Sequence, residues 1–125
     1  MASANKNLSK YDSSMVPNGT SFRICLIVSE WNQEITNRLY MGAQKTLLEH
    51  NVLPENIVKI RVPGSFELIY GASKAQTQNF DAIIVMGCII KGETRHFEFI
   101  ANAVAQGIKD LNVNGKSPVI FCVLT

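Results

Sequence analysis

The sequence has few of the features that mark secreted, membrane-bound or disulfide-rich proteins. The cysteines are odd in number, form no C-x-x-C pair and each lie within an apolar run: Cys25, Cys88 and Cys122. This pattern favours reduced core thiols over a disulfide framework or a metal site. No apolar run reaches the ~18 residues that span a bilayer, and no apolar signal core opens the chain. We therefore expect a cytoplasmic protein.

Motifs for nucleic acids, nucleotides and metals are also missing. The net charge is only +2, and the basic residues are scattered, so we expect no nucleic-acid partner. Neither His50 nor His96 has a carboxylate at metal-ligand spacing. The Rossmann and Walker glycine motifs are absent, which argues against dinucleotides and nucleoside triphosphates. We expect no metal site.

The composition that remains fits one globular domain with a single core. The chain has 125 residues, of which 46% are hydrophobic and 18% charged. Residues 1–21 are rich in Ser and Asn without periodicity and predict a flexible N-terminal extension. Residues 22–125 then form the domain.

The domain alternates apolar runs with amphipathic segments. Strands too apolar for one solvated face, separated by helices, indicate parallel pairing with right-handed crossovers. We predict a three-layer α/β/α sandwich of flavodoxin-like type with a four-stranded parallel sheet. The predicted strands are residues 22–30, 57–62, 80–90 and 117–125.

The segments between the strands have helical spacing. In residues 32–51 one stripe recurs every four residues, and residues 65–78 predict a shorter helix with Ser65 as a possible N-cap. The last strand should be covered on both faces, yet no helix follows it. Either a partner subunit covers it or residues are missing, and we favour a domain truncated at its C-terminal end. The two predicted stripes are Ile35, Leu39, Ala43 and Leu47, and Phe97, Ile100, Ala101, Val104, Ile108 and Leu111.

Loops after the carboxyl ends of parallel strands form the ligand site in such sheets. The turn over residues 92–94 leads from a strand into a helix, whose unpaired N–H groups and dipole suit an anion such as a phosphate. An ordinary N-cap at Thr94 is the alternative. His96 follows in the first helical turn, where a neutral ring is favoured, so we interpret it as a general base rather than a solvated histidine.

Two further loops offer groups for a planar, hydroxylated ligand. Trp31, the only tryptophan, is suited either to stacking on a heterocycle or to packing against a neighbour. Gly64 lets the backbone approach a ligand, and Ser65 supplies a hydroxyl. Glu67 supplies a carboxylate or stabilises its own helix.

Four stretches, taken together, resemble the 6,7-dimethyl-8-ribityllumazine synthase family of riboflavin biosynthesis. They are "EWNQEIT" (30–36), "VPGSFEL" (62–68), "GCIIKGETRHFEFIA" (87–101) and "PVIFCVLT" (118–125), and the similarity runs from about Phe22 to Thr125. The resemblance implies a condensation of 5-amino-6-(D-ribitylamino)uracil with 3,4-dihydroxy-2-butanone 4-phosphate, which releases phosphate and water without a cofactor.

The resemblance also implies roles for the loop residues. Trp31 would stack on the pyrimidine, Ser65 and Glu67 would hold the ribityl chain, and His96 would move protons. The phosphate would bind at Gly92, Glu93 and Thr94. The full set that we place in the substrate site is Trp31, Asn32, Gly64, Ser65, Phe66, Glu67, Cys88, Ile89, Ile90 and Phe121.

Family members form homopentamers, some of them assembled into icosahedral shells, with active sites between subunits. Phe121 would then reach a neighbour's site. Family chains continue past the "VLT" end with two helices that bear an arginine for the phosphate and a lysine. A non-catalytic flavin- or lumazine-binding or shell-forming subunit of the same fold remains an alternative, as does a generic flavodoxin-like phosphate binder.

Overall fold

The four predicted strands are present and form one parallel sheet. A computed structural model describes residues 10–125. Its strands are β1 (Ile24–Ser29), β2 (Ile57–Val62), β3 (Ala82–Cys88) and β4 (Val119–Leu124), in the order β2-β1-β3-β4. Each strand lies within its predicted apolar run. The order reverses direction between β1 and β3, which is where such sheets open a crevice.

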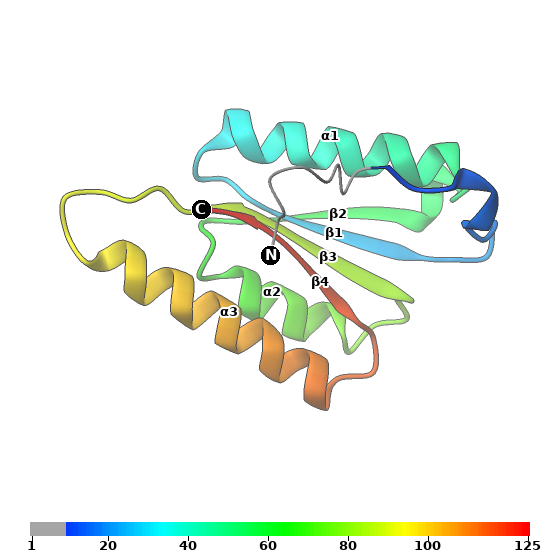
Figure 1. The fold of residues 1–125 in the computed structure, drawn as a ribbon. Coiled ribbons are helices and arrows are strands. Elements are labelled where there is room, and N and C mark those ends of the chain that lie inside the picture. The colour runs from blue at the N-terminus through cyan, green and yellow to red at the C-terminus, as the bar shows by residue number, and fades with distance from the viewer. Residues whose placement is uncertain (1–9) are drawn as a thin grey trace.

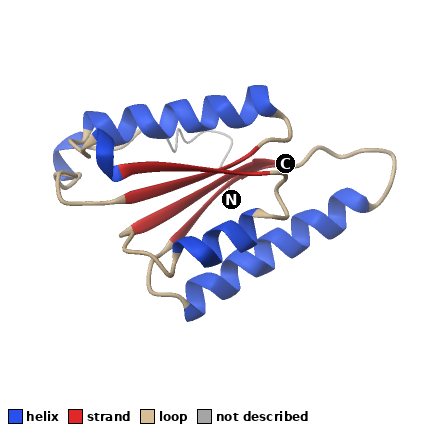
Figure 2. Ribbon diagram, turned by 180° about the vertical axis from the view of Figure 1, so that it is seen from behind, coloured by secondary structure: helices blue, strands red, loops and turns tan. Residues whose placement is uncertain are grey.

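Helices cover both faces of this sheet, as Figures 1 and 2 show. The helix α1 (Gln33–Glu49) lies over one face, whereas α2 (Leu68–Ala75) and α3 (His96–Asn114) lie over the other. The prediction of a three-layer sandwich is confirmed. Two 3-10 turns, Ser13–Met15 and Pro54–Asn56, complete the elements of the described residues.

The start of α2 differs from the prediction. Residues 65–67 form a turn, in which the N–H of Leu68 donates to the Ser65 carbonyl at 3.2 Å. The residue that precedes the helix is Glu67, so the proposed N-cap role of Ser65 is wrong. The hydroxyl of Ser65 is directed elsewhere, into the site described below.

The strands alternate their side chains between two cores. Towards α2 and α3, β1 contributes Cys25 and Ile27, and towards α1 it contributes Leu26 and Val28. Successive strand residues point to opposite faces, so both sets are needed to fill the two layers. This requirement explains why the central strands β1 and β3 are almost entirely apolar, whereas the edge strand β2 carries Lys59 and Arg61.

The predicted stripe on α3 is confirmed in full, whereas the predicted stripe on α1 is wrong at its first residue. All six residues of the α3 stripe pack on the core, whereas Ile35 at the start of the α1 stripe is 36% exposed and Thr36 is buried in its place. Four residues advance by about 40° more than one full helical turn. Residues at this spacing therefore move gradually around the helix, and Ile35, two steps before Ala43, no longer faces the sheet.

The edge strand β4 is the least covered of the four. Ile120, Phe121 and Leu124 are each about half exposed, at 50%, 46% and 48%. The sequence led us to expect both faces of this strand to be covered, and within residues 10–125 they are not.

Residues 10–21 contact the end of α1. The N–H of Gly19 donates to the His50 carbonyl at 2.7 Å, and the Tyr11 hydroxyl lies 3.0 Å from His50 Nε2. The flexible extension over residues 1–21 stays a prediction, since residues 1–9 lie outside the described range. Across the described part of the chain, no helix has both the length and the apolarity that crossing a membrane requires.

Candidate active site

A cavity of about 610 Å³ opens at the carboxyl ends of β1, β2 and β3. The loops after these three strands and the first turns of α3 all contribute to it. It therefore draws on three separate stretches of the chain, as the rule for open parallel sheets predicts. Its lining residues are Trp31, Asn32, Pro63, Gly64, Ser65, Phe66, Glu67, Cys88, Ile89, Ile90, Gly92, Thr94, His96, Phe97 and Ile100.

All but two of the residues predicted for the site line this cavity. The exceptions are Glu93, which is exposed in the loop before α3, and Phe121, which lies on β4. Sequence reasoning missed Phe97 and Ile100 as lining residues, because it assigned them only to the buried stripe of α3. Their positions could have indicated this role, because Phe97 and Ile100 follow His96 by one and four residues, within the first helical turns.

Trp31 stands at the mouth of the cavity with its ring uncovered. The side chain is 74% exposed, so it is no part of either core in residues 10–125. The chain reaches this point by following β2: the N–H groups of Glu30 and Trp31 donate to the carbonyls of Val62 and Pro63, at 2.9 and 3.2 Å. An uncovered indole at the edge of a crevice offers a stacking surface for a planar ligand.

The inner wall of the cavity is built around the Cys88 carbonyl. Asn32 Nδ2 donates to this oxygen at 3.2 Å, and the Ser65 hydroxyl donates to it at 3.4 Å. Both Ser65 and Cys88 are nearly buried, at 7% exposure each. A buried carbonyl needs such donors, so these bonds fix the wall in place.

The loop between β2 and α2 is closed by its own carboxylate. Glu67 Oε2 accepts a hydrogen bond from the N–H of Gly64 at 2.9 Å. The side chain thus stabilises the turn that precedes α2, and it makes no capping bond to the helix itself. Its other carboxylate oxygen has no partner in the described residues, so it can accept a bond from a ligand.

At the start of α3, the Thr94 side chain contacts the helix backbone. Its hydroxyl accepts the N–H of His96 at 3.4 Å, and the N–H groups of Glu98 and Phe99 donate to the Arg95 carbonyl. The residue that precedes the helix is Arg95, which makes no side-chain capping bond, so the N-cap interpretation of Thr94 is wrong. Among the described residues the N–H of Phe97 is left without a partner at the positive end of the helix dipole.

Comparison with known proteins identifies this architecture. A sequence model described as 6,7-dimethyl-8-ribityllumazine synthase matches residues 21–125. The chain belongs to the lumazine synthase family. Proteins with that name from Flavobacterium johnsoniae and Christiangramia forsetii are 58% and 55% identical to it over the whole chain, which spans 66% and 76% of their lengths. One from Parabacteroides distasonis is 49% identical, with 79% of its length covered.

This family consists of transferases of riboflavin biosynthesis. The four stretches on which the resemblance rested come from separate parts of the sequence, and three of them meet at the cavity. The fourth, residues 118–125, forms β4.

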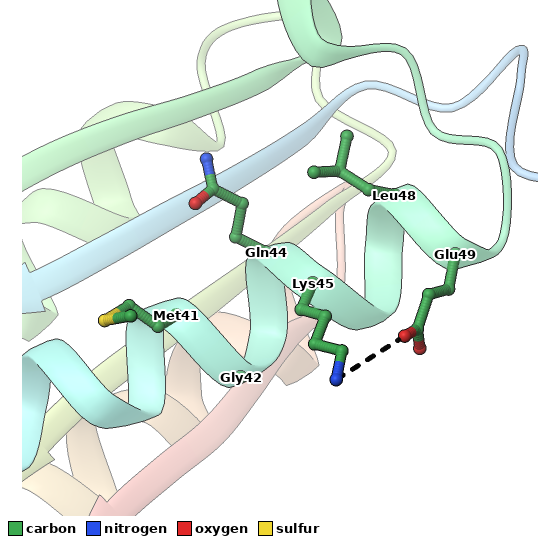
Figure 3. Close-up of a pocket in the computed structure, with 6 residues that line it drawn as sticks. All are labelled: Met41, Gly42, Gln44, Lys45, Leu48 and Glu49. Atoms are coloured by element: carbon green, nitrogen blue, oxygen red, sulfur yellow. Dashed lines mark ion pairs between the residues drawn. The ribbon is translucent and has the colours of Figure 1, made fainter.

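A second hollow, of about 640 Å³, lies along α1 and lacks the features of an active site. All of its lining residues come from α1, so groups from different elements do not converge there. Its only ion pair is the exposed Lys45–Glu49 contact at 3.8 Å (Figure 3). Exposed pairs one helical turn apart contribute little. The lining residues are Met41, Gly42, Gln44, Lys45, Leu48 and Glu49.

Cys25 and Cys122 lie outside the cavity and are poor nucleophiles. Burial raises the pKa of Cys25 to about 11, against a small opposing effect of the Arg23 charge. Burial also raises the pKa of Cys122. Both thiols therefore stay protonated at neutral pH, and only a thiolate is a good nucleophile.

Gly87 generates a prediction about the inner wall. A Cβ at this position would lie 2.6 Å from Ser65 Oγ and 2.9 Å from Leu68 Cδ1. We expect Gly87→Ala to lower the free energy of unfolding by about 1–3 kcal/mol, measured in urea, because both neighbours are buried. The matched control is Gly42→Ala, since nothing lies within 4 Å of a Cβ there. That control should gain about 0.5–1 kcal/mol. Equal stability of the two variants would contradict the tight contact.

Proposed function

We propose that this protein condenses 5-amino-6-(D-ribitylamino)uracil with 3,4-dihydroxy-2-butanone 4-phosphate to 6,7-dimethyl-8-ribityllumazine. The reaction releases phosphate and water and is the penultimate step of riboflavin biosynthesis. One observation carries the proposal: a single cavity collects an uncovered indole, a hydroxyl, a carboxylate, a helix start and a histidine. Membership of the lumazine synthase family supports it.

The pyrimidine binds along the inner wall in this proposal. Trp31 stacks on the heterocycle, since its ring is exposed at the cavity mouth. The backbone at Cys88, Ile89 and Ile90 meets the uracil edge. The free oxygen of Glu67 accepts a hydroxyl of the ribityl chain, and Ser65 lies within the same wall.

The phosphate binds at the start of α3. The unpaired N–H of Phe97 and the helix dipole favour an anion there. Gly92 leaves the loop open, because nothing lies within 4 Å of its missing Cβ. Glu93 takes part through its backbone, since its carboxylate would repel the phosphate. Thr94 orients the turn by accepting the N–H of His96.

The condensation needs protons moved at several points. The 5-amino group attacks the ketone carbon, and the adduct loses water to give an imine. A proton then leaves the carbon beside the imine as the phosphate departs, and ring closure releases a second water. Proton transfer by a positioned histidine suits each of these steps, and His96 lines the same cavity.

The assembly follows from the family in this proposal. We propose a homopentamer, alone or as part of an icosahedral shell, located in the cytoplasm. Active sites lie between subunits, and Phe121, 46% exposed on β4, reaches the neighbour's site. This arrangement accounts for the absence of Phe121 from the cavity of a single chain.

The activity test supplies both substrates to the purified protein and follows the absorbance and fluorescence of the lumazine. We expect product above the uncatalysed background, with one phosphate released per lumazine formed. Quenching of Trp31 by the pyrimidine without product would instead identify a non-catalytic binder.

His96→Ala should lower turnover by about 10- to 1,000-fold, while binding of the pyrimidine is largely retained. The reason is that the ring moves protons without holding the heterocycle. His50→Ala is the matched control, because His50 lies at the far end of α1 and lines neither cavity. Turnover in His96→Ala equal to that of the control would remove His96 from the mechanism.

Trp31→Ala should mainly weaken pyrimidine binding, by about 10-fold or more, because base–aromatic stacking contributes about 1–3 kcal/mol. Calorimetric titration of the pyrimidine measures this effect. Trp31→Phe keeps an aromatic face and should recover most of the affinity. An alanine variant with unchanged affinity would show that the ring serves only for packing.

A further inference from the structure

The ends of β1 and β3 part at the cavity. Their ladder runs as far as Val28 opposite Met86. Beyond this rung the backbone after β1 bonds only to the β2 side, through the N–H groups of Glu30 and Trp31. The last residue of β3, Cys88, therefore has no backbone donor on its β1 side among the described residues.

The separation of β1 and β3 leaves one group of the Cys88–Ile89 peptide, the Cys88 carbonyl, without a backbone donor. The N–H of this peptide donates to the Leu124 carbonyl of β4 at 2.8 Å. In a trans peptide the carbonyl points the opposite way, so the Cys88 oxygen faces the gap left by β1. The oxygen is at a nearly buried residue and needs a donor.

Side chains replace the missing rung. Asn32 Nδ2 donates from a position 56 residues away, and the Ser65 hydroxyl donates from 23 residues away. The 3.2 Å bond of Asn32 is the shorter of the two. The amide of Asn32 thus continues the β1–β3 ladder across the mouth of the crevice.

The backbone of Asn32 is shaped for this contact. It has φ 57° and ψ 48°, in the left-handed region that asparagine tolerates better than most residues. Its carbonyl accepts the N–H groups of Ile35 and Thr36 and so begins α1, yet its side chain makes no capping bond. An asparagine before a helix ordinarily caps it. Here the amide is directed to Cys88 instead.

We propose that Asn32 is a positioning residue, whose amide sets the distance between Trp31 and the Cys88–Ile90 backbone. These are the two walls between which a planar ring would lie. Asn32 holds them together by its backbone on one side and its Nδ2 donor on the other. The identity of the ring rests on the proposed function, whereas the contact itself exists in the ligand-free protein.

Asn32→Gly tests this role, because glycine keeps the left-handed backbone but removes the amide. The matched control is Asn51→Gly, at the other non-glycine residue with positive φ, 67° in the turn after α1. In ligand-free protein, we expect amide exchange at Ile89 to become about 10-fold faster in Asn32→Gly and to stay unchanged in the control. Asn32→Asp should be at least as fast as Asn32→Gly, because an acceptor would face an acceptor.

The same variants are titrated with 5-amino-6-(D-ribitylamino)uracil and assayed for turnover. We expect about 10-fold weaker binding in Asn32→Gly, since a wall displaced by an ångström misplaces the ring. Weaker binding with wild-type exchange at Ile89 would make Asn32 a direct ligand contact and overturn the proposal. Faster exchange with unchanged binding would overturn it too, since the bond would then be purely structural. A wild-type protein without turnover defeats the proposed function, whereas the exchange comparison in ligand-free protein still decides whether the contact exists.

Discussion

The parting of β1 and β3 at their carboxyl ends is the constraint on which the site depends. After β1 the chain turns to α1 on one face of the sheet, and after β3 it turns towards α3 on the other. Two loops that leave in opposite directions cannot share a ladder, so a crevice opens between them. The cavity of about 610 Å³ occupies this position. The strand order thus determines where a ligand can bind before any particular side chain is considered.

Where the β1–β3 ladder ends, a backbone carbonyl is left without a backbone donor, and two side chains supply the missing hydrogen bonds. The Cys88 carbonyl takes its donors from Asn32 and Ser65, and Ser65 fits beside β3 only because position 87 is glycine. The same bonds make the inner wall a defined surface. The stability of the sheet end and the order of the site therefore depend on the same few contacts. A substitution that breaks one of these contacts should change both properties.

The sequence predicted the layers and most of the residues that line the cavity, for reasons that the structure makes clear. Strands buried on both faces produce continuous apolar runs, and the rule for strand ends then located the loops. What could not be predicted depends on distant partners. The Ser65 hydroxyl resembles an N-cap locally, but its acceptor lies 23 residues away. The amide of Asn32 bonds a carbonyl 56 residues away, and no local pattern signals that pairing.

The site divides into a fixed wall and an exposed rim, and this division suits the proposed chemistry. Cys88 and Ser65 are nearly buried, whereas the residues from Lys91 to His96 are exposed. The His96 ring has no hydrogen-bond partner in residues 10–125, so only its place at the start of α3 constrains it. Imine formation and phosphate elimination need protons at different atoms of one substrate. A heterocycle held by a rigid wall beside a histidine free to reorient can serve both steps, which a histidine fixed to one partner could not.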